Sequence, residues 1–249
     1  MLSLFLGLAL CAFGSEMHLS RTPSYLKSAD RAYKERAKEE KAQEALKLYR
    51  TAKPAVDSLW RLSMACHYVG LHYTKESDEK IKLFREGKEA GLSAIKLDAD
   101  CAPCHFWTAI NMTLLGQQVG ALRMLFALSD IRKHIQKIIS LDPSYAYGGA
   151  YRLLGQIDQK LPGIAGGSNK AARQNFEKAI QLAPDEPLNY LLLARLLSED
   201  MDEDEEALAI AKKGLALPKP SFERAESLKA LEQMKQLVGK LEPSPGLKK

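Results

Sequence analysis

A recurring helix-ending pattern restricts the fold of this chain more than any other feature. In each copy a small or aliphatic residue stands three positions before a leucine, and aspartate or proline follows within two positions. Because positions three apart share one helical face, each copy predicts the end of an amphipathic helix. The leucines are Leu97, Leu141, Leu182 and Leu217, at intervals of 44, 41 and 35 residues.

A second pattern follows the first three stops. An aromatic residue is followed by an apolar residue three positions later and, in two of the copies, by a small residue four positions later. A small residue there lets a partner helix approach closely, which is how helical hairpins stack into a solenoid. The copies are Trp107-Ile110-Asn111, Tyr151-Leu154-Gly155 and Tyr190-Leu193-Ala194.

The repeat intervals are typical of tetratricopeptide and related repeats. The sequence therefore predicts an all-α fold, a tetratricopeptide-like solenoid of helical hairpins with about 11 helices over residues 23–239. β-branched and aromatic residues do not alternate with period two, so no strand is predicted. Hydrophobic residues make up 46% of the chain and charged residues 27%, enough for a packed core and a solvated exterior.

Charge and motifs argue against two classes of function. The 36 basic and 31 acidic side chains give a small and scattered net charge of +5, so we expect no nucleic-acid partner. The sequence contains no nucleophile elbow, no metalloprotease helix and no carboxylate pair that can be assigned to one cleft. We therefore expect a binding protein and not an enzyme.

The two ends of the chain are predicted to lie outside the repeat domain. The uncharged apolar run from Leu2 to Phe13 has the length of a secretory signal sequence, and small residues bracket a cleavage point after Gly14. This predicts a signal peptide over residues 1–14, a mature start at Ser15 and a periplasmic location. Cys11 offers an alternative, lipidation and a membrane tether. The Pro- and Lys-rich residues 240–249 are expected to form a flexible tail.

The motif Cys101-Ala-Pro-Cys104-His105 allows three interpretations. Two thiols followed by histidine match the pattern for covalent haem attachment, with His105 as the axial ligand. The same spacing suits a disulfide or ordinary buried thiols at the start of a helix, and a metal site that includes Cys66 or His67 is the third possibility. We expect no bound metal and keep haem as the alternative.

Several short motifs in the central repeats carry a family resemblance. They are Trp107-x-Ala109-x-Asn111, Leu141-Asp142-Pro143-Ser144-Tyr145-Ala146-Tyr147-Gly148-Gly149, Tyr151-Arg152-x-x-Gly155, Leu161-Pro162-Gly163-x-x-Gly166-Gly167, Lys170-Ala171 and Phe176-x-x-Ala179. In these motifs residues 107–197 resemble the T component associated with tripartite ATP-independent periplasmic (TRAP) transporters. The resemblance implies an accessory protein that contacts a periplasmic solute-binding protein and forms a homo-oligomer with a channel for a small organic ligand.

The candidate ligand- or partner-binding residues lie in the same central repeats. Asparagine and arginine can orient a carboxylate, while tyrosines supply an amphipathic wall. Packing and internal hydrogen bonding are the alternative roles, above all for the asparagine. A basic helix around Arg132 is the competing location for binding. The six candidates are Trp107, Asn111, Tyr145, Tyr147, Tyr151 and Arg152.

Three functional hypotheses follow. The first is a binding module that works with a periplasmic solute-binding protein. The second is a monohaem c-type electron-transfer protein that uses Cys101, Cys104 and His105. The third is a generic adaptor in envelope assembly.

Overall fold

A computed structural model of the chain describes residues 23–221 and 224–242. The predicted signal peptide, Cys11 and most of the predicted tail lie outside these residues. The described part contains eleven α-helices and no strand, as the sequence predicts. The helices are α1 (Lys27–Lys34), α2 (Glu39–Thr51), α3 (Val56–His72), α4 (Ser77–Leu97), α5 (Ala102–Val119), α6 (Ala121–Leu141), α7 (Tyr145–Lys160), α8 (Asn169–Leu182), α9 (Pro187–Asp200), α10 (Asp204–Leu215) and α11 (Ala225–Leu241).

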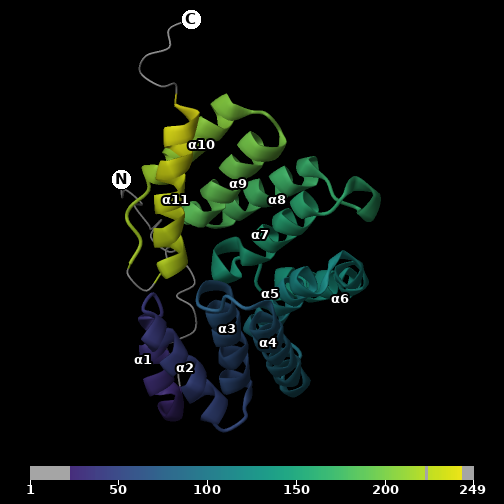
Figure 1. The fold of residues 1–249 in the computed structure, drawn as a ribbon, viewed down its shortest axis with the longest axis vertical. Helices are drawn as coiled ribbons and strands as arrows, with labels where there is room; N and C mark the ends of the chain where they lie inside the picture. Colours follow the sequence, from purple (N-terminus) through teal and green to yellow (C-terminus); the bar gives the residue numbers. More distant parts are fainter. Residues whose placement is uncertain (1–22, 222–223, 243–249) are drawn as a thin grey trace, which may run out of the picture.

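The predicted repeat register agrees with the helix ends. Helices α4, α6 and α8 end at Leu97, Leu141 and Leu182. Helix α10 ends at Leu215, two residues before the predicted position, and the Leu217 N–H bonds instead to the Gly214 carbonyl three positions back. The aromatic residues of the second pattern lie in α5, α7 and α9. Successive helices therefore form antiparallel hairpins that stack side by side (Figure 1).

Close approach within each hairpin depends on a small residue, although not always the predicted one. A Cβ on Gly155 of α7 would lie 2.5 Å from the ring of Phe176 in α8. At Asn111 of α5 the neighbouring helix supplies the glycine instead, since a Cβ on Gly87 of α4 would lie 2.6 Å from the Asn111 amide. The close contact is thus kept in both hairpins, but a different helix contributes the small residue.

The start of α7 departs from a right-handed helix. Ala146, Tyr147 and Gly148 have φ values of 51°, 59° and 76°, so three consecutive residues adopt the left-handed conformation. The following Gly149 lies against the ring of Phe106 in α5, where a Cβ would approach to 2.6 Å. This left-handed turn brings the start of α7 close to α5 as well as to α8.

The first and last elements of the solenoid meet. Arg36, which follows α1, donates to both carboxylate oxygens of Glu226 in α11, at 3.2 and 2.6 Å. The Arg36 guanidinium also lies over the rings of Tyr33 and Tyr68, 4.7 and 5.3 Å from their centroids. Figure 1 shows the first turns of α11 beside the α1–α2 end of the molecule. The Arg36–Glu226 ion pair thus joins the two ends of the solenoid.

Among the described residues, none of the helices combines the length and the apolar character that crossing a membrane requires.

Candidate functional site

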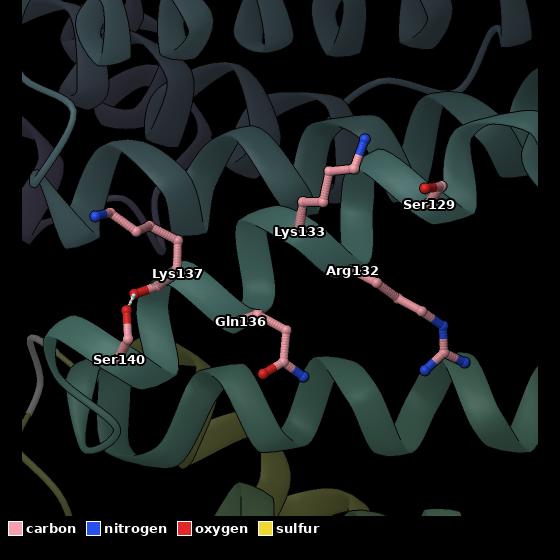
Figure 2. A pocket seen from close by; sticks show the side chains of 6 residues that line it. All are labelled: Ser129, Arg132, Lys133, Gln136, Lys137 and Ser140. Atoms are coloured by element: carbon pink, nitrogen blue, oxygen red, sulfur yellow. Dashed lines mark hydrogen bonds between the residues drawn. The ribbon is translucent and has the colours of Figure 1, made fainter.

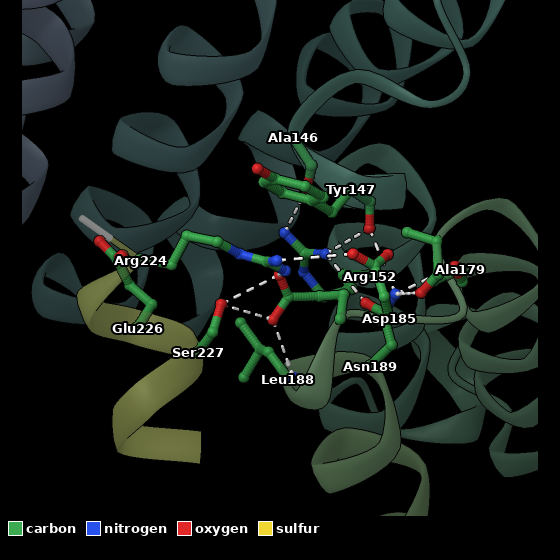
Figure 3. A network of polar contacts seen from close by, with 12 residues as sticks. Ala146, Tyr147, Arg152, Ala179, Asp185, Leu188, Asn189, Arg224, Glu226 and Ser227 are labelled. Carbon is green, nitrogen blue, oxygen red and sulfur yellow. Dashed lines mark hydrogen bonds and ion pairs between the residues drawn. The ribbon is translucent and has the colours of Figure 1, made fainter. Parts of the chain in front are cut away.

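The predicted candidates Tyr147 and Arg152 come together in a polar network inside the solenoid (Figure 3). Arg152 donates to the carbonyl oxygens of Ala146 and Tyr147, at 2.7 and 2.6 Å, and to the side-chain oxygen of Asn189 at 2.9 Å. Both carbonyls belong to the left-handed turn. Arg152 therefore stabilises the backbone at the start of its own helix.

Asn189 of α9 completes the support of this turn. Its amide donates to the carbonyl oxygens of Tyr147 and Ala179, at 3.2 and 3.0 Å, and the residue is fully buried. Burial lowers the pKa of Arg152, an effect that the carboxylates of Glu186 and Glu226 oppose. The donors expected to orient a ligand carboxylate are thus used within the chain.

A second charged layer covers the network from the α11 side. Arg224 lies 4.2 Å from the ring centroid of Tyr147 and donates to the buried carboxylate of Glu186. Ser227 donates to the same carboxylate at 2.8 Å. Burial lowers the pKa of Arg224, but its pairing with Glu186 outweighs this and raises the pKa overall. Sequence reasoning missed Glu186 and Arg224 because nothing local indicates that they meet.

Three of the other candidates, Trp107, Tyr145 and Asn111, are buried in the core. Phe106 makes edge contacts with Trp107 and Tyr145, with centroids 5.0 and 5.3 Å apart. Asn111 is fully buried and donates to the Ser63 and Trp107 carbonyls, both at 2.9 Å, which is the internal role that the sequence allowed. Tyr151 is half-buried on α7.

The Cys101-Ala-Pro-Cys104-His105 motif forms a disulfide between Cys101 and Cys104. Neither thiol is available to a haem vinyl group, and the His105 ring nitrogens contact the Ala99 carbonyl oxygen at 3.0 Å and the His134 ring at 2.9 Å. The haem interpretation of this motif is therefore wrong in this structure. Cys66 is free and buried, and the described residues hold no group of three or more potential metal ligands that includes it or His67.

The basic face of α6 carries a shallow groove with a volume of about 550 Å³ (Figure 2). Helix α6 packs closely on α5 but only sparsely on α7, which leaves one of its faces open beside α7. Side chains three or four positions apart share that face. The sequence indicated a basic helix around Arg132, but the uncharged lining residues were not predicted from it. The lining residues, which define the α6 groove, are Ser129, Arg132, Lys133, Gln136, Lys137 and Ser140.

The cations of the α6 groove have acidic neighbours at its edges. Arg132 pairs with Asp158 of α7 at 2.8 Å, Lys133 with Asp130 at 2.9 Å, and Lys137 with Asp100 at 2.7 Å. Lys133 is the most exposed of the three cations, with 73% of its side chain accessible. Solvent-exposed ion pairs, such as those of the two lysines, contribute about 0–1 kcal/mol to stability. The carboxylates of a partner can therefore take the place of the aspartates that pair with these lysines. The groove therefore offers exchangeable positive charge.

Comparisons with known proteins agree with the helical-repeat architecture. A family model described as Regulator of microtubule dynamics protein 1-3 matches residues 25–156. Regulator of microtubule dynamics protein 3 of Mus musculus is 24% identical over 198 residues, which are 74% of this chain and 42% of that protein. The Xenopus laevis protein of the same name is 27% identical over 191 residues, 71% of this chain and 41% of that protein.

A solved structure supports the fold independently. The crystal structure of a thermophilic TPR protein in Thermus thermophilus superposes with a TM-score of 0.62 at 16% sequence identity, covering 86% of this chain and 98% of that chain. The tetratricopeptide-like fold is thus confirmed. These relatives are not T components of TRAP transporters, so the comparisons support the helical-repeat part of the predicted resemblance and not its transporter part. The chain spans less than half the length of the curated relatives it matches.

Proposed function

This chain belongs to the Regulator of microtubule dynamics protein 1-3 family, and from that premise we propose that it is a non-enzymatic helical-repeat protein that binds an acidic segment of a protein partner in the α6 groove. The observation that carries the proposal is the lining of the groove, which contains three cationic side chains and no carboxylate, while the aspartates that pair with these cations lie at its edges. Complementary charge of this kind favours encounter and fixes the orientation of a partner.

The spacing of the cations restricts the partner. Lys133 and Lys137 lie one helical turn apart, which corresponds to about 6 Å along α6. Carboxylates at every second residue of an extended segment are separated by about 6.6 Å and match this spacing. Ser129, Gln136 and Ser140 add neutral hydrogen-bonding groups along the same face. An acidic, extended segment is therefore the preferred ligand.

The family supplies the first partner to test. Its name assigns a role in microtubule dynamics to the relatives, and an acidic, extended segment on the surface of the microtubule is the partner that we propose for this chain. Because the chain corresponds to less than half of those relatives, the proposal concerns binding and not the whole of their activity.

Co-sedimentation of the full chain with stabilised microtubules tests the proposal. The double variant Lys133→Gln/Lys137→Gln removes two groove cations, and we expect the affinity to fall by roughly threefold to tenfold, with binding that weakens as salt is added. The control is Lys82→Gln/Lys235→Gln, which removes two exposed lysines, each of which pairs with a glutamate three positions away.

Equal losses in the two double variants would mean that overall charge, and not the groove, mediates binding. Unchanged affinity in both would contradict the proposal outright.

The predicted contact with a periplasmic solute-binding protein and an organic ligand remains a second candidate. It rests on the motifs between residues 107 and 179. The Arg152 donors expected to bind an organic acid are occupied by backbone carbonyls, so we favour the α6 groove as the binding surface.

A further inference from the structure

The Cys101–Cys104 disulfide lies at the N-terminus of α5, the helix that begins at Ala102. Cys101 is the N-cap residue, and its sulfur accepts a hydrogen bond from the Cys104 backbone N–H at 3.2 Å. Only Ala102 and Pro103 separate the two cysteines. A disulfide that closes so short a loop restricts the unfolded chain least, so stabilisation of the fold is a weak explanation for it.

The two sulfurs have different environments. Cys104 is completely buried, whereas Cys101 keeps 8% of its surface accessible at the edge of the helix. A sulfur at a helix N-terminus that accepts a backbone N–H is stabilised as the thiolate, because the helix dipole and the hydrogen bond both favour negative charge there. Cys101 is therefore the less buried residue of the pair, and its sulfur is the one that is more reactive as a thiolate after reduction.

Contacts that do not involve the sulfurs hold the surrounding turn. The Asp100 carboxylate pairs with Lys137 of α6 at 2.7 Å, and the Asp100 N–H donates to Asp98 at 2.9 Å. The His105 ring contacts the Ala99 carbonyl oxygen at 3.0 Å. Because these contacts span both sides of the cysteine pair, the turn keeps its shape when the sulfur–sulfur bond is broken.

From these observations we infer that Cys101 and Cys104 form a thiol–disulfide exchange site, in which Cys101 is the sulfur that reacts with an external dithiol. One thiolate of the dithiol attacks the Cys101 sulfur, the Cys101–Cys104 bond breaks, and Cys104 leaves as a thiolate that takes up a proton. The first sulfur of the dithiol is now bonded to Cys101 in a mixed disulfide. The second thiol of the same dithiol molecule attacks that first sulfur and releases Cys101 as a thiolate. Two electrons pass from the dithiol, which becomes a disulfide, to the cysteine pair.

The same exchange reaction can proceed in the opposite direction. The reduced Cys101 thiolate attacks an external disulfide, and the neighbouring Cys104 then attacks the Cys101 sulfur and resolves the mixed disulfide. This site adjoins the α6 groove through the Asp100–Lys137 pair, but its test does not involve partner binding.

Reduction of the folded full chain with dithiothreitol, followed by alkylation with N-ethylmaleimide and peptide mapping, tests the inference. Cys66 provides an internal reference, because it is free and buried, and burial raises the pKa of its thiol well above the ordinary value. We expect Cys101 to be labelled while the completely buried Cys104 and Cys66 stay unlabelled. Labelling of Cys101 only under conditions that also label Cys66 would show that reduction requires unfolding, and the inference would be overturned.

Two single variants test the assignment of Cys101. In Cys104→Ser the remaining Cys101 thiol should form a mixed disulfide with oxidised glutathione at least about tenfold faster than Cys104 does in Cys101→Ser. Circular dichroism of each variant verifies that the fold is kept. Equal rates, or a faster reaction of Cys104, would contradict the assignment.

Discussion

At the scale of single residues, Arg152 supports a backbone turn that few sequences can adopt. Ala146, Tyr147 and Gly148 all have positive φ, and only the last of them has a glycine's freedom. Such a conformation costs of order 1–3 kcal/mol for each non-glycine residue and persists only when its surroundings hold it. The Arg152 guanidinium does so by donating to the carbonyl oxygens of Ala146 and Tyr147.

Arg152→Ala should therefore destabilise the fold. The variant leaves the Ala146 carbonyl and the Asn189 side-chain oxygen without the guanidinium donor, while the Tyr147 carbonyl keeps only Asn189, and each buried group that loses its partner costs about 1–3 kcal/mol. We expect the free energy of unfolding in urea to fall by about 2–4 kcal/mol. Arg85→Ala, at an exposed position of α4, is the control and should be close to neutral. Equal stability of the two variants would mean that Arg152 is free to bind a ligand.

Gly155→Leu tests the repeat register. Even a Cβ at this position would lie 2.5 Å from Phe176, so a leucine must push α7 and α8 apart. Overpacking of this kind costs about 1–3 kcal/mol, and occasionally more. Gly239→Leu is the matched control, because a Cβ at that helical glycine meets nothing within 4 Å. A melting temperature of Gly155→Leu equal to that of the control would contradict the register.

The roles of these residues could be predicted from the sequence only in part. The small residue at position 155 follows from the repeat pattern, and its close contact is confirmed. The sequence predicts a ligand-orienting role for Arg152, whereas its donors bind the chain's own backbone. The Gly148-Gly149 pair hints at an unusual turn, but it does not identify the side chain that stabilises the turn.

At the scale of secondary-structure elements, helix ends could be predicted and contacts between helices could not. The ends of α4, α6 and α8 follow from a local signal, a leucine and the helix-breaking residues after it. The pairing of His105 on α5 with His134 on α6 depends on how two helices pack, which the sequence periodicity leaves open. The disulfide is one of the alternatives that the cysteine spacing allows, but spacing alone cannot choose among them.

The His105–His134 pair predicts a pH dependence of α5–α6 packing. Burial lowers the pKa of both rings, and a neighbouring cation adds to this effect: Lys137 for His105 and the partner ring for His134. A pKa that is lower in the folded state than the unfolded value of about 6.5 means that stability is complete above pH 6.5 and is lost as the pH falls below it. The Ala99 carbonyl and the nearby Asp100 and Asp130 carboxylates oppose this loss.

Urea unfolding at pH 8 and pH 5 measures the effect. The wild-type chain should lose more stability between these values than His134→Gln, which cannot place a second positive charge beside His105. His67, whose pKa burial lowers to about 4, contributes to the loss equally in both proteins and cancels in the comparison. Identical losses in the two proteins would show that the pair does not link pH to stability.

At the scale of the whole molecule, the solenoid could be predicted, but the contact between its two ends could not. The repeats are local patterns, whereas Arg36 and Glu226 are 190 positions apart and have no sequence feature in common. Arg36 is buried between two tyrosine rings and the carboxylate, so removal of the carboxylate leaves a buried cation without its partner. Such losses are strongly destabilising.

Glu226→Lys should separate the two ends of the solenoid. It places two cations together where α11 meets the end of α1, and we expect the radius of gyration in X-ray scattering to increase and the melting temperature to fall. Glu232→Lys makes the same change at an exposed position of the same helix and should alter neither quantity. Unchanged scattering of Glu226→Lys would show that packing between successive helices alone sets the shape of the molecule.

The central claim is that the partner binds along the α6 groove. Hydrogen–deuterium exchange of the full chain, measured with and without stabilised microtubules, tests it most directly. We predict slower exchange in peptides that cover residues 129–140, with little change in peptides from α1 and α2. Protection confined to the inner network around residues 145–152, with none on α6, would contradict the claim.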